Sequence, residues 1–169
     1  GVRYSGGEGY SAGLRGEFRV EDSDNPARVQ DRDTLLLSGY IERKTSDDWR
    51  LIGNLDAVLA DADTDNIRDG RYVELQLGYA YRPVQNDRLN ALVSYTYLYD
   101  MPGADQVNVD GDADGPKQRS HILNLGLSYD LNQQFTLGAK YGFRYREEAP
   151  RDSDAFVSSI AHLGILRLD

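Results

Sequence analysis

The sequence predicts an all-β fold, an antiparallel up-and-down transmembrane β-barrel in which eight strands are visible. Three observations lead to this prediction. Apolar and polar residues alternate with period two over long stretches of the chain. These stretches last roughly ten to twelve residues, whereas soluble strands usually have about five or six and membrane-spanning strands about nine to eleven. The connections between them are alternately short and long, which is typical of outer-membrane barrels.

The first four predicted strands each have an apolar and a polar face. Residues 10–21 set aromatic and aliphatic side chains against arginines and glutamates. Residues 34–44 are ambiguous, and we interpret them as a strand because their neighbours are strands of similar length. Residues 49–60 begin at the only tryptophan and alternate along most of their length, and residues 72–82 alternate throughout. This period-two pattern is the signature of a strand whose two faces meet different surroundings.

The last four predicted strands repeat the pattern. Residues 89–100 alternate, although two leucines interrupt their polar face, and residues 121–130 set leucines against small and polar side chains. The clearest strand is 135–146, where twelve residues alternate without a break. Residues 156–168 would also suit a helical face, and we interpret them as a strand for the reason given for 34–44. Residues 1–4 could be the end of a preceding strand, so eight is a lower bound.

The connections differ in length and in charge. The four long connections and their flanking residues hold 18 acidic and 7 basic side chains, although the whole chain has a net charge of only −9. The acidity therefore belongs to one end of the predicted barrel, where we expect extracellular loops. The long connections are 22–33, 61–71, 101–118 and 147–154, and the short ones are 45–48, 83–88 and 131–134.

Two features of the alternation indicate that the apolar face meets lipid and the polar face is inside. Glycines accumulate on the polar face, where a crowded interior requires small residues. Ten aromatic side chains on the apolar face form two belts around an aliphatic band, as expected at the two membrane interfaces. The belt residues are Trp49, Tyr79, Tyr81, Tyr129 and Phe135 at the short-turn end, and Phe18, Tyr97, Tyr99, Phe143 and Tyr145 toward the long connections.

The predicted interior carries charges of both signs. In an eight-stranded barrel these charges would pair into a salt-bridge network that plugs the lumen, because buried charge persists only when it is paired. In a barrel with more strands the same side chains would line a wet channel, and the sequence does not distinguish the two. The predicted lumen residues are Arg15, Glu17, Arg19, Glu42, Arg50, Asp56, Glu74, Arg82, Lys140 and Arg144.

Four short stretches resemble a known class of protein. They are 48–53 (DWRLIG), 78–84 (GYAYRPV), 87–92 (DRLNAL) and 125–131 (LGLSYDL). They resemble the C-terminal barrel region of large Gram-negative surface proteins and, more generally, porin-like outer-membrane barrels. The resemblance implies a β-barrel in the outer membrane, often the anchor or translocator of a larger exported part. Barrels of this kind usually end on an aromatic residue, whereas this chain ends on Asp169.

Candidate chemistry is sparse. The loop from Asp110 through Asp112 and Asp114 begins like a calcium-binding loop, but its twelfth position is His121 in place of the bidentate glutamate. We expect no cofactor beyond Ca²⁺ or Mg²⁺ held loosely at the acidic loops.

Hydrolytic dyads are also unsupported. Ser120 and His121 are adjacent and would face opposite sides of a strand, and Ser158 lies about 13 Å from His162 along one. We therefore do not expect an enzyme.

These observations favour one function and leave two alternatives open. We expect residues 1–169 to form a single barrel domain in the bacterial outer membrane, which could be an excerpt of a longer chain. Its role would be a structural anchor that displays acidic loops. The alternatives are a passive diffusion pore, alone or as a section of a larger one, and a soluble lipocalin-like ligand-binding barrel. Expected partners are outer-membrane lipid, lipopolysaccharide and the outer-membrane assembly machinery. Nucleic acid is not expected, because the acidic balance disfavours phosphate binding.

Overall fold

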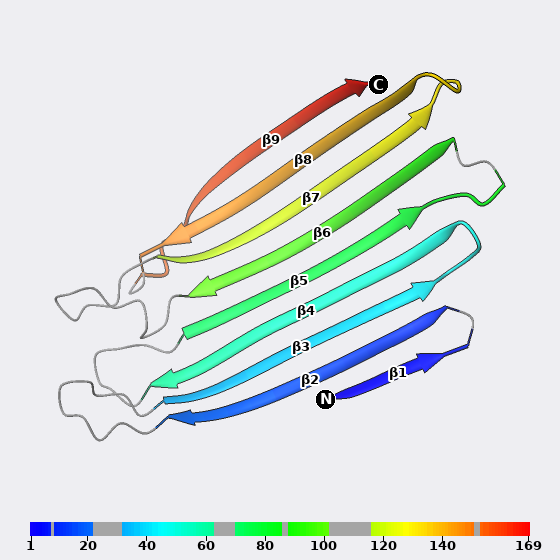
Figure 1. Cartoon of the computed structure of the whole chain (residues 1–169). Coiled ribbons are helices and arrows are strands. Elements are labelled where there is room, and N and C mark those ends of the chain that lie inside the picture. The colour runs from blue at the N-terminus through cyan, green and yellow to red at the C-terminus, as the bar shows by residue number, and fades with distance from the viewer. Residues whose placement is uncertain (8, 22–31, 63–69, 86–87, 102–115, 151–152) are drawn as a thin grey trace.

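The protein is a single antiparallel sheet of nine strands (Figure 1). Its structure, a computed structural model, describes residues 1–7, 9–21, 32–62, 70–85, 88–101, 116–150 and 153–169. Every strand pairs with the next strand in the chain, so the sheet is an up-and-down meander. The strands are β1 (Val2–Gly6), β2 (Tyr10–Glu21), β3 (Arg32–Lys44), β4 (Trp49–Ala62), β5 (Gly70–Tyr81), β6 (Leu89–Met101), β7 (Lys117–Asp130), β8 (Thr136–Ala149) and β9 (Val157–Leu168).

The predicted all-β up-and-down fold is confirmed, with one more strand than the eight that the alternation showed. The additional strand is β1, which pairs with β2 from Val2 opposite Leu14 to Gly6 opposite Tyr10. Five residues are too few to show a convincing period of two, so the pattern left only the possibility of a strand there. The ambiguous segments 34–44 and 156–168 are strands, β3 and β9.

Several strands extend further toward the long connections than their apolar pattern indicates. The largest difference is in β7, which begins at Lys117 where the alternation begins at His121. Lys117 pairs with Ala149 at the end of β8, which also outlasts its predicted range. Backbone hydrogen bonds continue the ladder through polar residues, and hydrophobic periodicity does not report these residues.

The sheet is not closed in this chain. β1 and β9 are its two edges, and both run toward the end where the short turns lie. Asp169, directly after β9, exchanges backbone hydrogen bonds of 2.9 and 3.0 Å with Thr136 at that end. The closed barrel therefore stays a prediction. Among the described residues, no helix has the length and apolar character needed to cross a membrane.

Side chains fix the short turns. Asn132 Oδ1 accepts hydrogen bonds from the backbone N–H groups of Gln134 and Phe135 at 2.8 and 3.0 Å, an arrangement that stabilises tight turns. In the turn between β3 and β4, the Lys44 ammonium donates to Asp47 at 2.7 Å. This bond holds the pKa of the Asp47 carboxyl below its ordinary value. These turns set the register of the hairpins that they join.

The described part of the sheet has almost no core of its own. Its buried hydrophobic residues are only the small residues Ala60 and Ala149, and no large side chain among the described residues is fully buried. A soluble sheet normally buries one apolar face against a second layer. Here both faces of a single layer are open, so the surroundings of each face must account for its composition.

Candidate functional site

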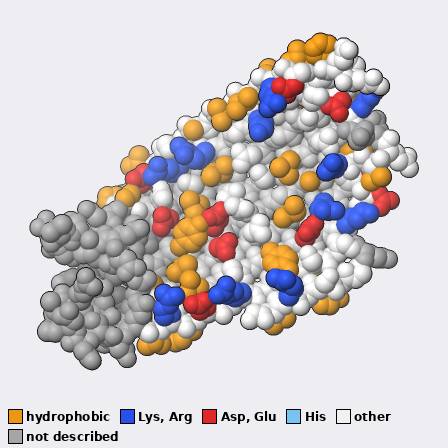
Figure 2. Space-filling model, viewed as in Figure 1, with side chains coloured by type: hydrophobic (Ala, Val, Ile, Leu, Met, Phe, Trp, Pro, Cys, Tyr) orange, Lys and Arg blue, Asp and Glu red, His pale blue; other side chains and the backbone are white. Residues whose placement is uncertain are grey.

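The polar face of the sheet is the candidate site. Because residues paired across an antiparallel ladder share a face, the register shows which side chains stand together. Arg15, Ser38, Asp56 and Glu74 lie directly opposite one another across β2 to β5. The same ladders place nine of the ten predicted lumen residues on this face, and the tenth, Arg82, directly follows β5. Figure 2 shows this face, with acidic and basic side chains intermixed across it.

Ion pairs on this face are open to solvent. Arg15 and Arg19 lie 3.0 and 3.5 Å from the carboxylate of Glu17, and Arg50 lies 3.0 Å from Glu42. The Arg15 side chain is 72% exposed. Exposed pairs of this kind contribute about 0–1 kcal/mol each. In the nine-stranded sheet these charges line an open surface, and this arrangement gives a tightly packed salt-bridge plug no support.

Three carboxylates of this face, Asp56, Glu74 and Asp100, belong to the three central strands, β4 to β6. Glu74 accepts hydrogen bonds from Tyr72 and Gln76 on its own strand, and it stands opposite Asp56. On β6, Asp100 accepts a hydrogen bond of 3.2 Å from Gln118.

Basic side chains flank this acidic centre on both sides. Arg15 and Arg19 lie on β2, toward one edge of the sheet, and Lys140 and Arg144 lie on β8, toward the other. A sheet that curves into a barrel would set these basic walls across the lumen from the acidic one.

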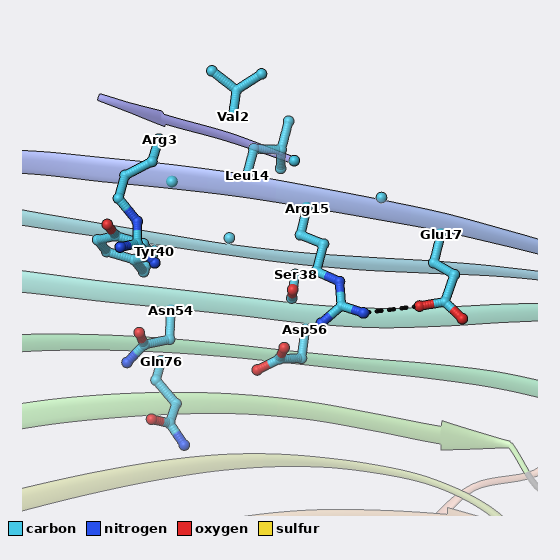
Figure 3. A pocket seen from close by; sticks show the side chains of 14 residues that line it. Val2, Arg3, Leu14, Arg15, Glu17, Ser38, Tyr40, Asn54, Asp56 and Gln76 are labelled. Carbon is cyan, nitrogen blue, oxygen red and sulfur yellow. Dashed lines mark hydrogen bonds and ion pairs between the residues drawn. The ribbon is translucent and has the colours of Figure 1, made fainter. Parts of the chain in front are cut away.

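A hollow of about 860 Å³ begins at the β1 edge, where Gly1 and the apolar-face residues Val2, Leu14 and Gly16 line it, and extends over the polar face to β5 (Figure 3). Its wall combines cationic, anionic, amide and aromatic groups: Arg3, Arg15, Glu17, Ser38, Tyr40, Asn54, Asp56 and Gln76. Tyr40 stands opposite Gly13 on β2 and opposite Asn54 on β4. A Cβ atom on Gly13 would lie 2.3 Å from Cε1 of Tyr40, so the absence of a side chain at Gly13 gives the ring its place against β2.

Gly13→Ala is expected to destabilise the protein by about 1–2 kcal/mol, because the Tyr40 ring must move or the strand must shift. Gly78→Ala is the matched control, since Gly78 lies in a strand on the same face and its nearest neighbours would be 3.9 Å away. We expect this control to leave stability unchanged or to raise it by about 0.5 kcal/mol. Urea titration of the protein in detergent micelles measures both variants. Equal stability of the two would show that the Tyr40 ring does not depend on Gly13.

The opposite face carries the predicted aromatic residues. Phe135 directly precedes β8, and the register places the other nine belt residues on this apolar face. Trp49 packs on Tyr79 and Tyr81 near the short turns, with ring centroids 4.6 and 4.7 Å apart. Toward the long connections, Tyr97 and Tyr145 stand on either side of His121 in one row across β6, β7 and β8. Phe143, by contrast, pairs with Leu123 near the middle of the strands, so the two aromatic belts stay a prediction.

Residues 30–153 match the model of a protein family described as "Putative MetA-pathway of phenol degradation". The chain belongs to this family. No curated protein and no solved structure matches it. The phenol-degradation family model extends over β3 to β8, the six central strands, and it includes the acidic centre of the polar face. The sequence predicted a resemblance to bacterial surface barrels. Of that prediction, the antiparallel all-β sheet is confirmed, and a porin-like barrel stays a prediction.

In this member of the phenol-degradation family, the structure tests the serine–histidine dyad candidate but not the calcium-loop candidate. Asp110, Asp112 and Asp114 lie outside the described residues, as do most residues of the long acidic connections. Within the described part of the chain, no three His, Asp or Glu side chains gather in a way that could hold a metal ion. Ser120 is on the polar face and His121 on the apolar face, because their neighbours in β7 and β8 alternate in the same way.

Sequence reasoning missed two clusters that only the register brings together. The first is around His121, whose Nδ1 lies 2.8 Å from the Tyr95 hydroxyl. The second is at the long-connection end of the apolar face, where Arg119 donates to Glu147 through two nitrogens at 2.5 and 3.1 Å. The same guanidinium lies 4.3 Å from the centre of the Phe156 ring. An aromatic row with paired charges beyond it is the composition expected at a membrane interface.

Proposed function

We propose that this protein forms a β-barrel in the bacterial outer membrane whose polar face lines a water-filled passage for small aromatic compounds. The proposal takes its solute class from the phenol-degradation family to which the chain belongs. Lipid and lipopolysaccharide would surround the apolar face, and the outer-membrane assembly machinery would insert the barrel. The passage itself requires no catalytic group, so we propose transport without a reaction.

A band without charge on the apolar face carries the proposal. Among the described side chains of this face, charged residues occur only near the ends of the strands: Asp33, Arg43, Arg71, Lys117, Arg119 and Glu147. Between these ends the face is aliphatic and aromatic, and much of it is exposed, including Leu14, Leu77, Val93 and Leu127. A large exposed apolar surface with polar borders indicates contact with a protein partner or a membrane. The bilayer explains why the band continues across all nine strands.

The height of this band agrees with a bilayer. Phe135 and Tyr145, one from each belt, are ten residues apart along the chain at β8. Ten residues span about 33 Å at about 3.3 Å per residue. With a strand tilt of about 45° this becomes about 23 Å along the membrane normal, close to the apolar band of about 25 Å in known barrels.

The open edges favour a wide lumen over a plugged one. A membrane does not tolerate the unpaired backbone groups of an open sheet edge, so the barrel must close. β1 and β9 run in the same direction, and antiparallel closure requires an odd number of further strands between them, from the same protein or from a partner. Such a barrel has at least ten strands, more than the eight whose interior is just filled by side chains. The exposed ion pairs of the polar face fit this wider interior.

Single-channel recording in planar lipid bilayers tests the proposal. The intact protein, purified from membranes in detergent, is expected to give steady conductance steps. Insertion without conductance would overturn the passage and favour the structural anchor with a plugged lumen. High solubility without detergent would overturn both membrane functions in favour of a soluble ligand-binding barrel.

A further inference from the structure

We infer that the hollow between β1 and β5 is a binding site for a small hydroxylated aromatic carboxylate, a compound with a carboxylate at one end of a ring and a hydroxyl at the other. The inference rests on the proposed function and goes further, because it names a ligand class and the residues that recognise it. The hollow of about 860 Å³ is within the range of pockets that bind small molecules. Its wall offers cationic groups, an aromatic ring and hydrogen-bond acceptors.

Tyr40 supplies the aromatic surface. Its ring lines the hollow beside the Arg3 side chain (Figure 3), and the residue is 37% exposed. The place of the ring is set from below, because Gly13 has no side chain where the ring lies against β2. A ligand ring that packs on a fixed aromatic side chain gains contact area and a preferred orientation.

Two arginines extend their side chains across the hollow, Arg3 to the Tyr40 ring and Arg15 toward Asp56 (Figure 3). Arg3 on β1 and Arg15 on β2 both contribute to its wall (Figure 3). A guanidinium has five N–H donors, and the bond of 3.0 Å from Arg15 to Glu17 engages one of them. The planar fork of donors that remains matches the geometry of a carboxylate.

Acceptors come from the two strands of the hollow that are farthest from the β1 edge. Asp56 and Asn54 come from β4, and Gln76 comes from β5. Asp56 is two strands away from Arg15, a backbone separation of about 10 Å. The hydroxyl of the ligand would donate a hydrogen bond to the Asp56 carboxylate.

The combination of groups excludes simpler ligands. A phosphate-like dianion would be repelled by Asp56 and Glu17, which share the hollow with the arginines. A plain hydrocarbon ring would leave both the arginines and the carboxylates without a partner from the ligand. A ligand that carries an anion, a ring and a hydroxyl donor satisfies all three parts of the wall.

Calorimetry on the intact protein in detergent micelles tests this inference, with 4-hydroxybenzoate as the probe and with benzoate and phenol as the partial ligands. We expect 4-hydroxybenzoate to bind more tightly than either partial ligand. Arg15→Gln is expected to weaken the binding of 4-hydroxybenzoate and of benzoate about tenfold and to leave the binding of phenol unchanged. Asp56→Asn should weaken the binding of 4-hydroxybenzoate and of phenol, and the binding of benzoate should be unchanged or slightly tighter. Tyr40→Leu should weaken all three.

Arg43→Gln is the matched control, because Arg43 lies on the opposite face of β3 and is not part of the hollow. Melting curves of every variant show that the comparisons are made on folded protein. The inference is overturned if the three compounds bind equally weakly, or if Arg15→Gln and Arg43→Gln have the same effect. Conductance without binding would reject the site and keep the passage, whereas binding without conductance would reject the passage and keep the site.

Discussion

Leu123→Arg is expected to destabilise the protein in lipid or detergent by about 2–4 kcal/mol, the cost of an arginine at the middle of a bilayer on the outside of a barrel. Leu123 lies near the middle of β7, between Tyr95 and Phe143 in the neighbouring strands, and is 41% exposed. In water this half-open position would accept an arginine at low cost, since the long side chain could extend into solvent. The large loss of stability therefore depends on lipid at this face.

Asn124→Arg is the control, one residue further along the same strand. Asn124 is exposed on the polar face, opposite Ser94 and Gly142, where an added arginine has room and water. We expect a change in the free energy of unfolding within about 0.5 kcal/mol. Urea titrations of both variants in phospholipid vesicles give the comparison. A small, equal effect of the two substitutions would contradict the assignment of the apolar face to lipid.

Glu74→Gln is expected to change the ion preference of the passage and to leave the stability of the barrel nearly unchanged. A unit charge about 6 Å from a permeating ion in water contributes about 0.7 kcal/mol. The preference for cations over anions should therefore fall about two- to threefold. In a plugged lumen Glu74 would be part of a buried network, and removing its charge would cost about 3–5 kcal/mol of stability instead. Reversal potentials in salt gradients and melting curves separate the two outcomes.

Asp33→Asn removes the same charge from the opposite face, near the end of β3, and is the control for this experiment. It should alter neither reversal potential nor melting. A strong loss of stability in Glu74→Gln, without a change in selectivity, would favour the anchor with a plugged lumen. Equal shifts in both variants would show that the charge acts through the overall potential of the protein and not from the wall of the passage.

The alternation of the sequence predicted the layer and its two faces well, because period two is a direct consequence of strand geometry. The clear alternation of residues 135–146 corresponds to β8, and nine of the ten predicted lumen residues lie on one face of the sheet, whereas Arg82 directly follows β5. The pattern failed where the chain is short or polar. Strand β1 has only five residues, and β7 begins with four polar ones. Neither gives a hydrophobic signal, although backbone pairing continues through both.

The site was less predictable, since it depends on register. Nothing in the sequence shows that Tyr40 stands opposite Gly13, because 26 other residues lie between them and the pairing is set by the β2–β3 ladder. The same holds for His121 and Tyr95, which belong to different strands. A search for such sites could use one signal. It would look for a tyrosine at a polar-face position of one strand and a glycine at a polar-face position of the neighbouring strand. Closure of the sheet could not be predicted from the sequence for a different reason. The edge strands β1 and β9 do not pair with each other, so closure depends on other pairing partners for both edges.

Quenching of tryptophan fluorescence by brominated phospholipids most directly tests whether the apolar face meets the bilayer. Trp49 is the only tryptophan of the chain, and it lies in the aromatic belt at the short-turn end, packed on Tyr79. In vesicles, lipids brominated near the headgroup should quench its fluorescence strongly, and lipids brominated near the chain end should quench it less. Fluorescence that is the same in brominated and unbrominated vesicles would place Trp49 away from lipid and would contradict the assignment of the two faces.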